Sequence, residues 1–286
     1  MRILLYILIL IISLSTSLIS AQDFKGIATY KSQRKMDIQL DSTQMNEEMR
    51  SRMMAMLKKQ FEKEYTLKFN NHESIYKEVE NLKKPSGVSS GGMQVVVMTA
   101  GGSDILYKNN NENRYVNQNE LFGKIFLIQD SLEDVDWSLE KETKNIGEYT
   151  CFKATFKRMV RKPKMKVKID SEDSKESEEE EKEVEEEEVE QIVTAWYTLQ
   201  IPVKYGPGAY GGLPGLILEI NAGTETILCS KIILNPKGGI NINEPVKGKK
   251  VNQKEFDEIL DKKMKERESQ YDSRRKGEVH SIKING

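Results

Sequence analysis

Apolar and polar residues alternate along most of the chain from Ile27 onward, the period-two pattern of strands with one buried face. Tyr65, Leu67 and Phe69 alternate in this way, and Asn70-Asn71 marks a turn before a second arm. The predicted strands are 27–30, 65–69, 74–79, 105–108, 114–117, 124–129, 137–140, 148–157, 192–203, 216–220 and 226–234. Short strands with Gly and Asn between them predict a mainly β (α+β) fold, with a curved, half-barrel-like antiparallel sheet.

Two segments have helical spacing instead. Asp41 and Gln44 fit a capping box, and a helix that packs on the sheet is predicted after them. Its apolar stripe consists of Met45, Met49, Met53, Met56, Leu57 and Phe61. A second helix is predicted near the end of the chain, with Asn252 as its N-cap and a polar tail, 267–277, that frays. Its apolar face consists of Phe256, Ile259, Leu260 and Met264.

The methionine stripe has three interpretations. It can pack the helix onto the sheet, it can form an adaptable apolar ligand face (Met45, Met49, Met53, Met56 and Phe61), or its thioethers can hold Cu(I). Packing is the interpretation that demands least of the sequence. We therefore expect no cofactor or metal.

Two internal segments have the composition of disordered chain. Residues 84–102 are rich in Ser and Gly. Residues 158–190 form a charged insertion, basic at first and then acidic, with fourteen acidic residues and two lysines over 170–190. Such a like-charge run lacks the apolar area to offset the entropy of ordering. The basic part can fold back on the acidic part.

The first 21 residues have the features of a cleavable signal peptide, namely Arg2, an apolar run over 3–12 and small residues that end at Ala21. We expect a mature chain that begins at Gln22 and forms one domain over 22–286. The alternative is a membrane anchor, but the run falls short of the roughly 20 apolar residues that a span needs. The pattern predicts export to the periplasm, the outer-membrane periphery or the medium, without a membrane span in the mature chain.

Charge and cysteine content narrow the function further. The formal net charge is −1, which argues against a general nucleic-acid binder. Cys151 and Cys229 are the two cysteines, and both lie in strand-like runs. In an exported protein they can form a disulfide, or they can be two small buried core residues. We predict the disulfide.

Catalytic patterns are weak. A Gly-x-Ser-x-Gly sequence occurs around Ser89, but a nucleophile elbow needs a strand before the serine and a helix after it. Lys84-Pro85 precedes it and more glycines follow. The two histidines, His72 and His280, have no metal-ligand spacing. We expect no enzymatic activity, and a hydrolase is a distant alternative.

A glycine- and proline-rich motif is the most specific feature of the sequence. A strand is predicted to end at Pro202, a shaped loop follows, and a strand begins near Leu216. The glycines there permit φ > 0 or close backbone approach, and the prolines fix φ. Alternation places Leu216 and Leu218 inward if Glu219 faces water. The motif residues are Trp196, Pro202, Gly206, Pro207, Gly212, Leu213, Pro214, Gly215, Leu216 and Ile217.

This motif resembles the signature of the GLPGLI family, since Gly212 to Ile217 reproduce it letter for letter. Trp137 and the segment 144–154 are similar to the hairpin that precedes it in the family. The resemblance implies an exported Bacteroidota protein with no established activity, whose outline is similar to periplasmic lipoprotein carriers. We therefore expect a binding protein that holds a hydrophobic ligand or an envelope partner. The alternative is an accessory subunit of an outer-membrane transport or assembly complex, which docks through an exposed aromatic patch around Tyr205 and Tyr210.

Overall fold

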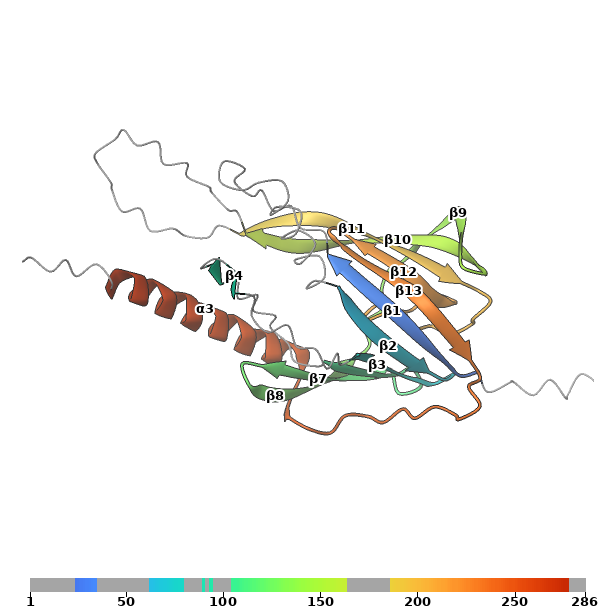
Figure 1. The fold of residues 1–286 in the computed structure, drawn as a ribbon, viewed down its shortest axis with the longest axis horizontal. Coiled ribbons are helices and arrows are strands. Elements are labelled where there is room, and N and C mark those ends of the chain that lie inside the picture. The colour runs from blue at the N-terminus through green and yellow to red at the C-terminus, as the bar shows by residue number, and fades with distance from the viewer. Residues whose placement is uncertain are drawn as a thin grey trace, which may run out of the picture. The chain divides into compact units, whose positions relative to one another are not determined.

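The computed structural model describes residues 24–34, 62–79, 89–90, 93–94, 104–163 and 186–277. It confirms a mainly β protein. A twelve-stranded open sheet has the strand order β14-β8-β7-β6-β3-β2-β1-β13-β12-β11-β10-β9 (Figure 1). Contacts divide the chain into two compact units, residues 1–31, 63–133 and 229–286 in the first and residues 32–62 and 134–228 in the second.

The first unit contains three antiparallel connections made by short turns. In the turn between β2 and β3, Asn70 Oδ1 accepts hydrogen bonds from the backbone N–H groups of His72 and Glu73, at 2.8 and 2.7 Å. Phe122 and Gly123 have φ of 51° and 76° between β7 and β8, the conformation of a two-residue type I′ hairpin. The strands are β1 (Gly26–Arg34), β2 (Lys63–Phe69), β3 (Glu73–Glu78), β6 (Ile105–Asn109), β7 (Arg114–Leu121), β8 (Lys124–Ser131) and β14 (Lys249–Val251). The last residues of β1, 32–34, belong to the second unit.

The sheet is mixed rather than wholly antiparallel, because β14 pairs with β8 in parallel. After β14 the chain enters α3 (Gln253–Gly277), which packs against β8. Asn252 caps α3 as expected: its Oδ1 accepts the N–H of Glu255 at 2.8 Å, and Glu255 Oε2 accepts the N–H of Asn252 at 3.0 Å. Phe256, Ile259 and Leu260 pack on the core of β7, β8 and β14.

Two expectations about this helix were wrong. Met264 was assigned to its apolar face, but the side chain is 55% exposed. The stretch 267–277 was expected to fray, but it continues the helix to Gly277. Phe256, Ile259 and Leu260, which contact the sheet, lie in the first turns of the helix, and charged residues, many of them helix-favouring, predominate in the turns that follow.

The second unit contains the motif. Its strands are β9 (Ser138–Ile146), β10 (Tyr149–Pro163), β11 (Glu186–Thr198), β12 (Leu216–Ala222) and β13 (Glu225–Leu234), the last shared with the first unit. Ala154, Val193, Ala195, Ile217 and Ile220 are fully buried on one face of these strands. We call this side the core face and the opposite side the outer face.

The hairpin of β10 and β11 corrects the predicted bounds of the charged insertion (Figure 1). Residues 158–163 and 186–190 were placed in it, yet they pair as strands, with Arg161 opposite Glu188. Lys157 Nζ lies 3.0 Å from Glu190 Oε1. The basic stretch therefore does fold back on the acidic one as far as the structure describes it, because opposite charges face each other across the ladder.

Two other segments lie partly or wholly outside the described residues. In the Ser/Gly segment the structure describes only β4 (Ser89–Ser90) and β5 (Met93–Gln94), which pair with each other. Residues 1–23, with the predicted signal peptide, and the predicted methionine-rich helix are outside the described ranges. Within those ranges, no helix combines the length and apolar character required to cross a bilayer.

Candidate functional site

The loop between β11 and β12, residues 199–215, is held by backbone hydrogen bonds within itself and to the start of β12. The N–H of Gly212 donates to Lys204 O at 3.0 Å, and the N–H of Ile217 donates to Tyr205 O at 3.0 Å. The N–H of Leu216 donates to Ile201 O at 2.9 Å. We call this segment the motif loop.

Apolar side chains of the motif loop are packed in the core. Ile201, Val203 and Leu213 are buried, and so is Pro207, whereas Pro202 and Pro214 are exposed. Tyr205 was a candidate for an exposed aromatic patch, but its side chain is only 1% exposed. The loop is therefore a core element, and it offers no aromatic patch at Tyr205.

The motif glycines are required at their positions for different structural reasons. A Cβ on Gly215 would lie 2.0 Å from Thr198 O, and one on Gly206 would lie 2.8 Å from Ile217 Cδ1. Gly212 instead has φ of 87°, which L-residues rarely adopt. The sequence interpretation that these glycines permit positive φ or close approach is consistent with these positions.

Two tryptophans make specific contacts, one with the motif loop and one with charged residues on the outer face. Trp137 Nε1 donates to Gly211 O at 2.9 Å, and its ring meets Phe156 edge-on at 4.7 Å between centroids. Trp196 lies on the outer face, where Lys144 Nζ stands 4.4 Å from the ring centroid. Lys144 Nζ also donates to Glu219 Oε2 at 2.7 Å.

Five polar side chains gather near the end of the core face: Ser32, Arg158, Gln191, Tyr210 and Glu225. We call them the Tyr210 cluster. Arg158 Nε donates to Gln191 Oε1 at 2.8 Å, and Ser32 Oγ donates to Glu225 Oε1 at 3.1 Å. Burial raises the pKa of Tyr210, the charge and hydrogen bond of Arg158 lower it, and the charge of Glu225 raises it. A cation and an anion therefore both act on one partly buried phenol.

The strand registers place this cluster beside an apolar floor. Arg158 shares the core face with Phe156, two residues away, and Glu225 stands opposite Ala222. Val193 and Ala222 beneath them are buried. Gly223, with φ of 62°, forms the adjacent turn, where a Cβ would lie 2.4 Å from Gln191 Nε2. Polar groups thus border a buried apolar floor, with the half-buried ring of Phe156 beside it.

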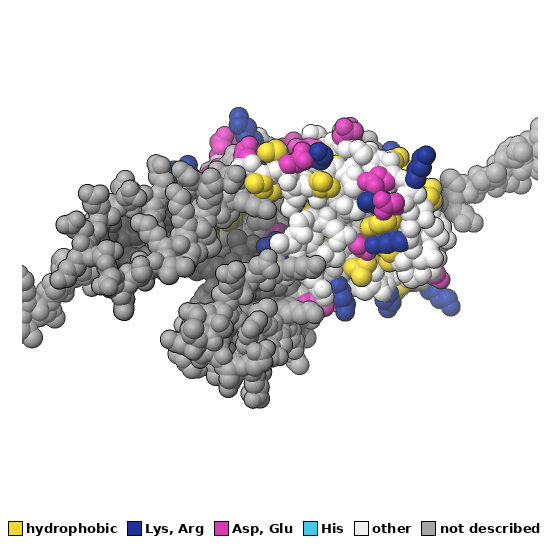
Figure 2. All heavy atoms as spheres, turned by 90° about the horizontal axis from the view of Figure 1, so that it is seen from above, with side chains coloured by type: hydrophobic (Ala, Val, Ile, Leu, Met, Phe, Trp, Pro, Cys, Tyr) yellow, Lys and Arg dark blue, Asp and Glu magenta, His cyan; other side chains and the backbone are white. Residues whose placement is uncertain are grey.

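The outer face of the same strands carries paired charges and isolated apolar groups. Lys153 Nζ lies 3.0 Å from Glu140 Oε2 and 3.2 Å from Glu142 Oε1. Ile192 and Leu228 are exposed on this face. Figure 2 shows one face of the molecule on which hydrophobic side chains lie in small groups among acidic and basic ones.

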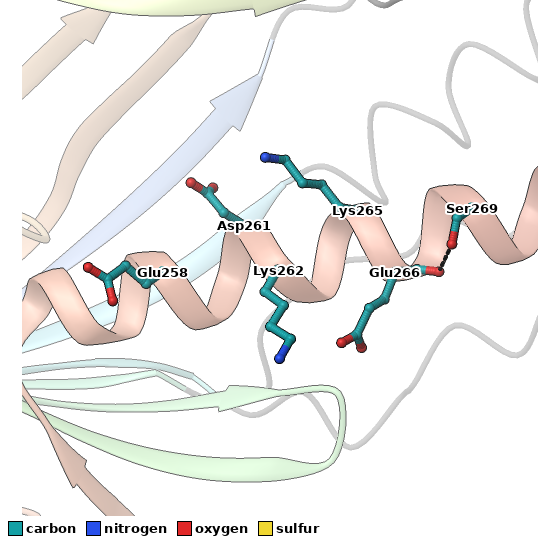
Figure 3. Close-up of a pocket in the computed structure, with 6 residues that line it drawn as sticks. All are labelled: Glu258, Asp261, Lys262, Lys265, Glu266 and Ser269. Atoms are coloured by element: carbon teal, nitrogen blue, oxygen red, sulfur yellow. Dashed lines mark hydrogen bonds between the residues drawn. The ribbon is translucent and has the colours of Figure 1, made fainter.

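A hollow of about 560 Å³ lies along α3 and is lined by charged and polar residues of that helix (Figure 3). Lys262 and Glu266 point to one side of the helix, and Asp261 and Lys265 point to the other. Ser269 Oγ donates to Glu266 O at 3.0 Å. The described residues that line the hollow all belong to α3 and are charged or polar, so it has the chemistry of a solvated helix surface.

Two ionisable groups of the first unit that the sequence did not single out, the buried Lys108 and the partly buried Asp104, have shifted pKa values. Burial lowers the pKa of Lys108 on β6 to about 7. Burial likewise raises the pKa of Asp104 to about 6, against the opposing charge of Lys63. Within the described ranges no group of three His, Cys, Asp or Glu side chains could hold a metal ion. His72 is exposed beside Asn111.

The predicted disulfide was wrong. Cys151 and Cys229 are buried free thiols. Cys151 lies in β10, next to β9 and β11, while Cys229 lies in β13, next to β12 and β1. A disulfide joins Cα atoms within about 7 Å, a distance that adjacent strands provide and that two intervening strands do not. The cysteines are instead two small buried core residues, which was the other interpretation of the sequence.

We predict that both thiols are detected only after unfolding. Burial raises the pKa of Cys151 to about 11, so little thiolate forms at pH 8. A thiol reagent at that pH should react slowly with native protein, and should label both cysteines in denaturant without reductant. Unfolded, unreduced protein without a reactive thiol would show that the bond forms after all.

Comparison with known proteins gives a match of one family model to part of the chain. A family model described as "Protein of unknown function (Porph_ging)" matches residues 137–219, which run from Trp137 to Glu219. No curated protein matches the sequence. Two structures of PNGF-II, in C2 and P21 space groups, are similar with TM-scores of 0.44 and 0.45 at 11% identity. The matches cover 83% and 82% of this chain but 32% and 33% of PNGF-II, so the chain spans about a third of that protein.

Proposed function

We propose that this protein is an exported, non-enzymatic binding protein of the cell envelope, of the GLPGLI type, and that it holds a ligand at the Tyr210 cluster. Tyr205 and Leu213, which flank Tyr210 in the sequence, are both buried. Their packing holds the part of the motif loop that carries Tyr210. Trp137 anchors the neighbouring Gly211 carbonyl. The loop thereby presents a partly buried phenol in a fixed place.

One observation carries the proposal. Arg158 and Glu225 both act on Tyr210, yet none of the ion pairs in the described part of the chain joins them. Each side chain is instead held by a neutral partner, Gln191 for the guanidinium and Ser32 for the carboxylate. Two opposite charges oriented by neutral groups retain hydrogen-bonding capacity for a third molecule. Phe156 on the same face favours a ligand with an apolar part.

The second candidate is an accessory subunit that docks through the outer face. Exposed Ile192 and Leu228 near Trp196 favour it, because aromatic and aliphatic anchors within a polar rim are typical of protein interfaces.

Native mass spectrometry of the protein gently extracted from its host envelope tests the proposal. Wild-type protein should carry a small-molecule adduct, which Arg158→Gln should lose. Lys157→Gln is the matched control, since Lys157 directly precedes Arg158 in β10, faces the opposite side and pairs with Glu190. A protein adduct that survives Arg158→Gln and is lost in Ile192→Glu would favour the accessory subunit. Bare protein in every case would contradict both.

A further inference from the structure

We infer that the ligand of the Tyr210 cluster is a small zwitterion, a peptide or amino acid with a free ammonium group, a free carboxylate and an apolar side chain. The inference rests on the proposed function and specifies its ligand. It is based on which side chains the strand registers bring to one end of the core face.

Arg158 is suited to the carboxylate. Its guanidinium is a planar fork that matches two carboxylate oxygens. The Nε–H is already used, because it donates to Gln191 Oε1 at 2.8 Å. That bond fixes the plane of the fork. The guanidinium also has a side-chain hydrogen bond with Tyr210, and its remaining N–H groups can donate to a ligand. A carboxylate beside Tyr210 would therefore find oriented donors.

Glu225 is suited to the ammonium group. Its Oε1 accepts the Ser32 hydroxyl at 3.1 Å, and Ser32 is only 7% exposed, so the carboxylate is held by a buried partner. The remaining lone pairs, on Oε2 in particular, can accept N–H bonds. An ammonium ion offers three such donors and a compensating charge.

The spacing between the two groups fits a short ligand. β10 and β13 are separated by β11 and β12 in the strand order, which puts roughly 14 Å between their backbones at the usual strand spacing. The long side chains of Arg158 and Glu225 span part of that distance. A dipeptide measures about 7 Å when extended, and Phe156, which lies on the same face and is half-buried, can contact its apolar side chain.

A ligand with a single charge matches the cluster less well. A simple anion held by Arg158 would bring no partner for Glu225, and a simple cation would bring none for Arg158. Complementary charges at both ends satisfy both groups at once, and specificity follows from the cost of leaving one unpaired.

Isothermal titration of the full chain with alanyl-phenylalanine, its N-acetyl form and its C-terminal amide tests the inference. The free dipeptide should bind about 10-fold more tightly than either blocked form, because each blocked form loses one charge-assisted contact. Arg158→Gln should remove the advantage over the amide, and Glu225→Gln the advantage over the N-acetyl form. Lys157→Gln should change neither. Free phenylalanine, titrated in parallel, distinguishes an amino-acid ligand from a peptide ligand.

Two results would overturn the inference: equal affinities of the three dipeptide forms for wild-type protein, or no binding of any zwitterion at millimolar concentration. Thermal melts of each variant that match the wild type exclude loss of fold as the cause. If the envelope extract still yields an adduct that depends on Arg158, the ligand class is wrong and the proposed function stands. If no adduct appears either, both fail.

Discussion

Gly215→Val should destabilise the protein by about 3 kcal/mol or more, because overpacking against a fixed backbone costs at least as much as overpacking a core. A Cβ at this position would lie 2.0 Å from Thr198 O and 2.6 Å from Thr198 C. Those atoms end β11, and Thr198 is fully buried, so they cannot move aside without disturbing the strand. Either the motif loop or the end of β11 must shift.

Urea melts of Gly215→Val, Gly215→Ala and Gly208→Ala measure this effect. Gly215→Ala should lower the stability nearly as much as Gly215→Val, since the Cβ itself makes the clash. Gly208 is the matched control in the same loop, with φ of 58° and open space around it. Its replacement should cost only the left-handed strain of about 1 kcal/mol. Wild-type stability of Gly215→Val would contradict the close approach and suggest that the loop is free to adapt.

The strands could be predicted from sequence because each buries one face, so that hydrophobicity alternates within a few residues. The hairpin of β2 and β3 is the clearest case, as Leu67 and Phe69 are buried and Asn70 makes the turn. β14 was missed, because three residues are too few to show a period and the pairing with β8 depends on the fold. The charged ends of β10 and β11 were missed because composition alone describes them as disordered, while pairing depends on register.

The shape of the motif loop was predictable, but the role of each glycine was not. Gly212 and Gly215 look alike in the sequence, yet the first is required for its positive φ and the second for a close contact with Thr198. That difference depends on where β11 ends in space. The sequence can show that the backbone is constrained at these glycines, but only the structure shows which atoms or which φ impose the constraint.

The Tyr210 cluster could not be found from the sequence. Ser32 and Glu225 are 193 positions apart, and Arg158 and Gln191 are 33 apart. No motif joins them, and Arg158 fell within the predicted charged insertion. Tyr210 alone carried a signal, because it lies within the glycine-proline motif. The predicted methionine face, in contrast, lies outside the residues that the structure describes.

Leu216→Ala and Leu218→Ala should each destabilise the protein by roughly 2–5 kcal/mol, the cost of a large-to-small change that leaves a cavity. Both side chains are buried, at 0% and 1% exposure. The sequence pattern placed Ile217 on the opposite side, but Ile217 is buried as well. The reason is a register shift: Glu219 stands opposite Trp196 and Ile217 opposite Tyr197, so Leu218 is an extra residue in β12.

Glu219→Ala separates packing from surface effects in the same strand. The sequence predicted little cost if Glu219 faced solvent, but its side chain is only 15% exposed. It accepts hydrogen bonds from Lys144 Nζ at 2.7 Å and from Asn221 Nδ2 at 2.8 Å. Its loss should cost about 1 kcal/mol, clearly less than either leucine. In denaturant melts, both leucine variants should therefore be less stable than Glu219→Ala. The reversed order of stability would mean that polar contacts on the outer face, rather than the buried side of β12, hold the motif in place.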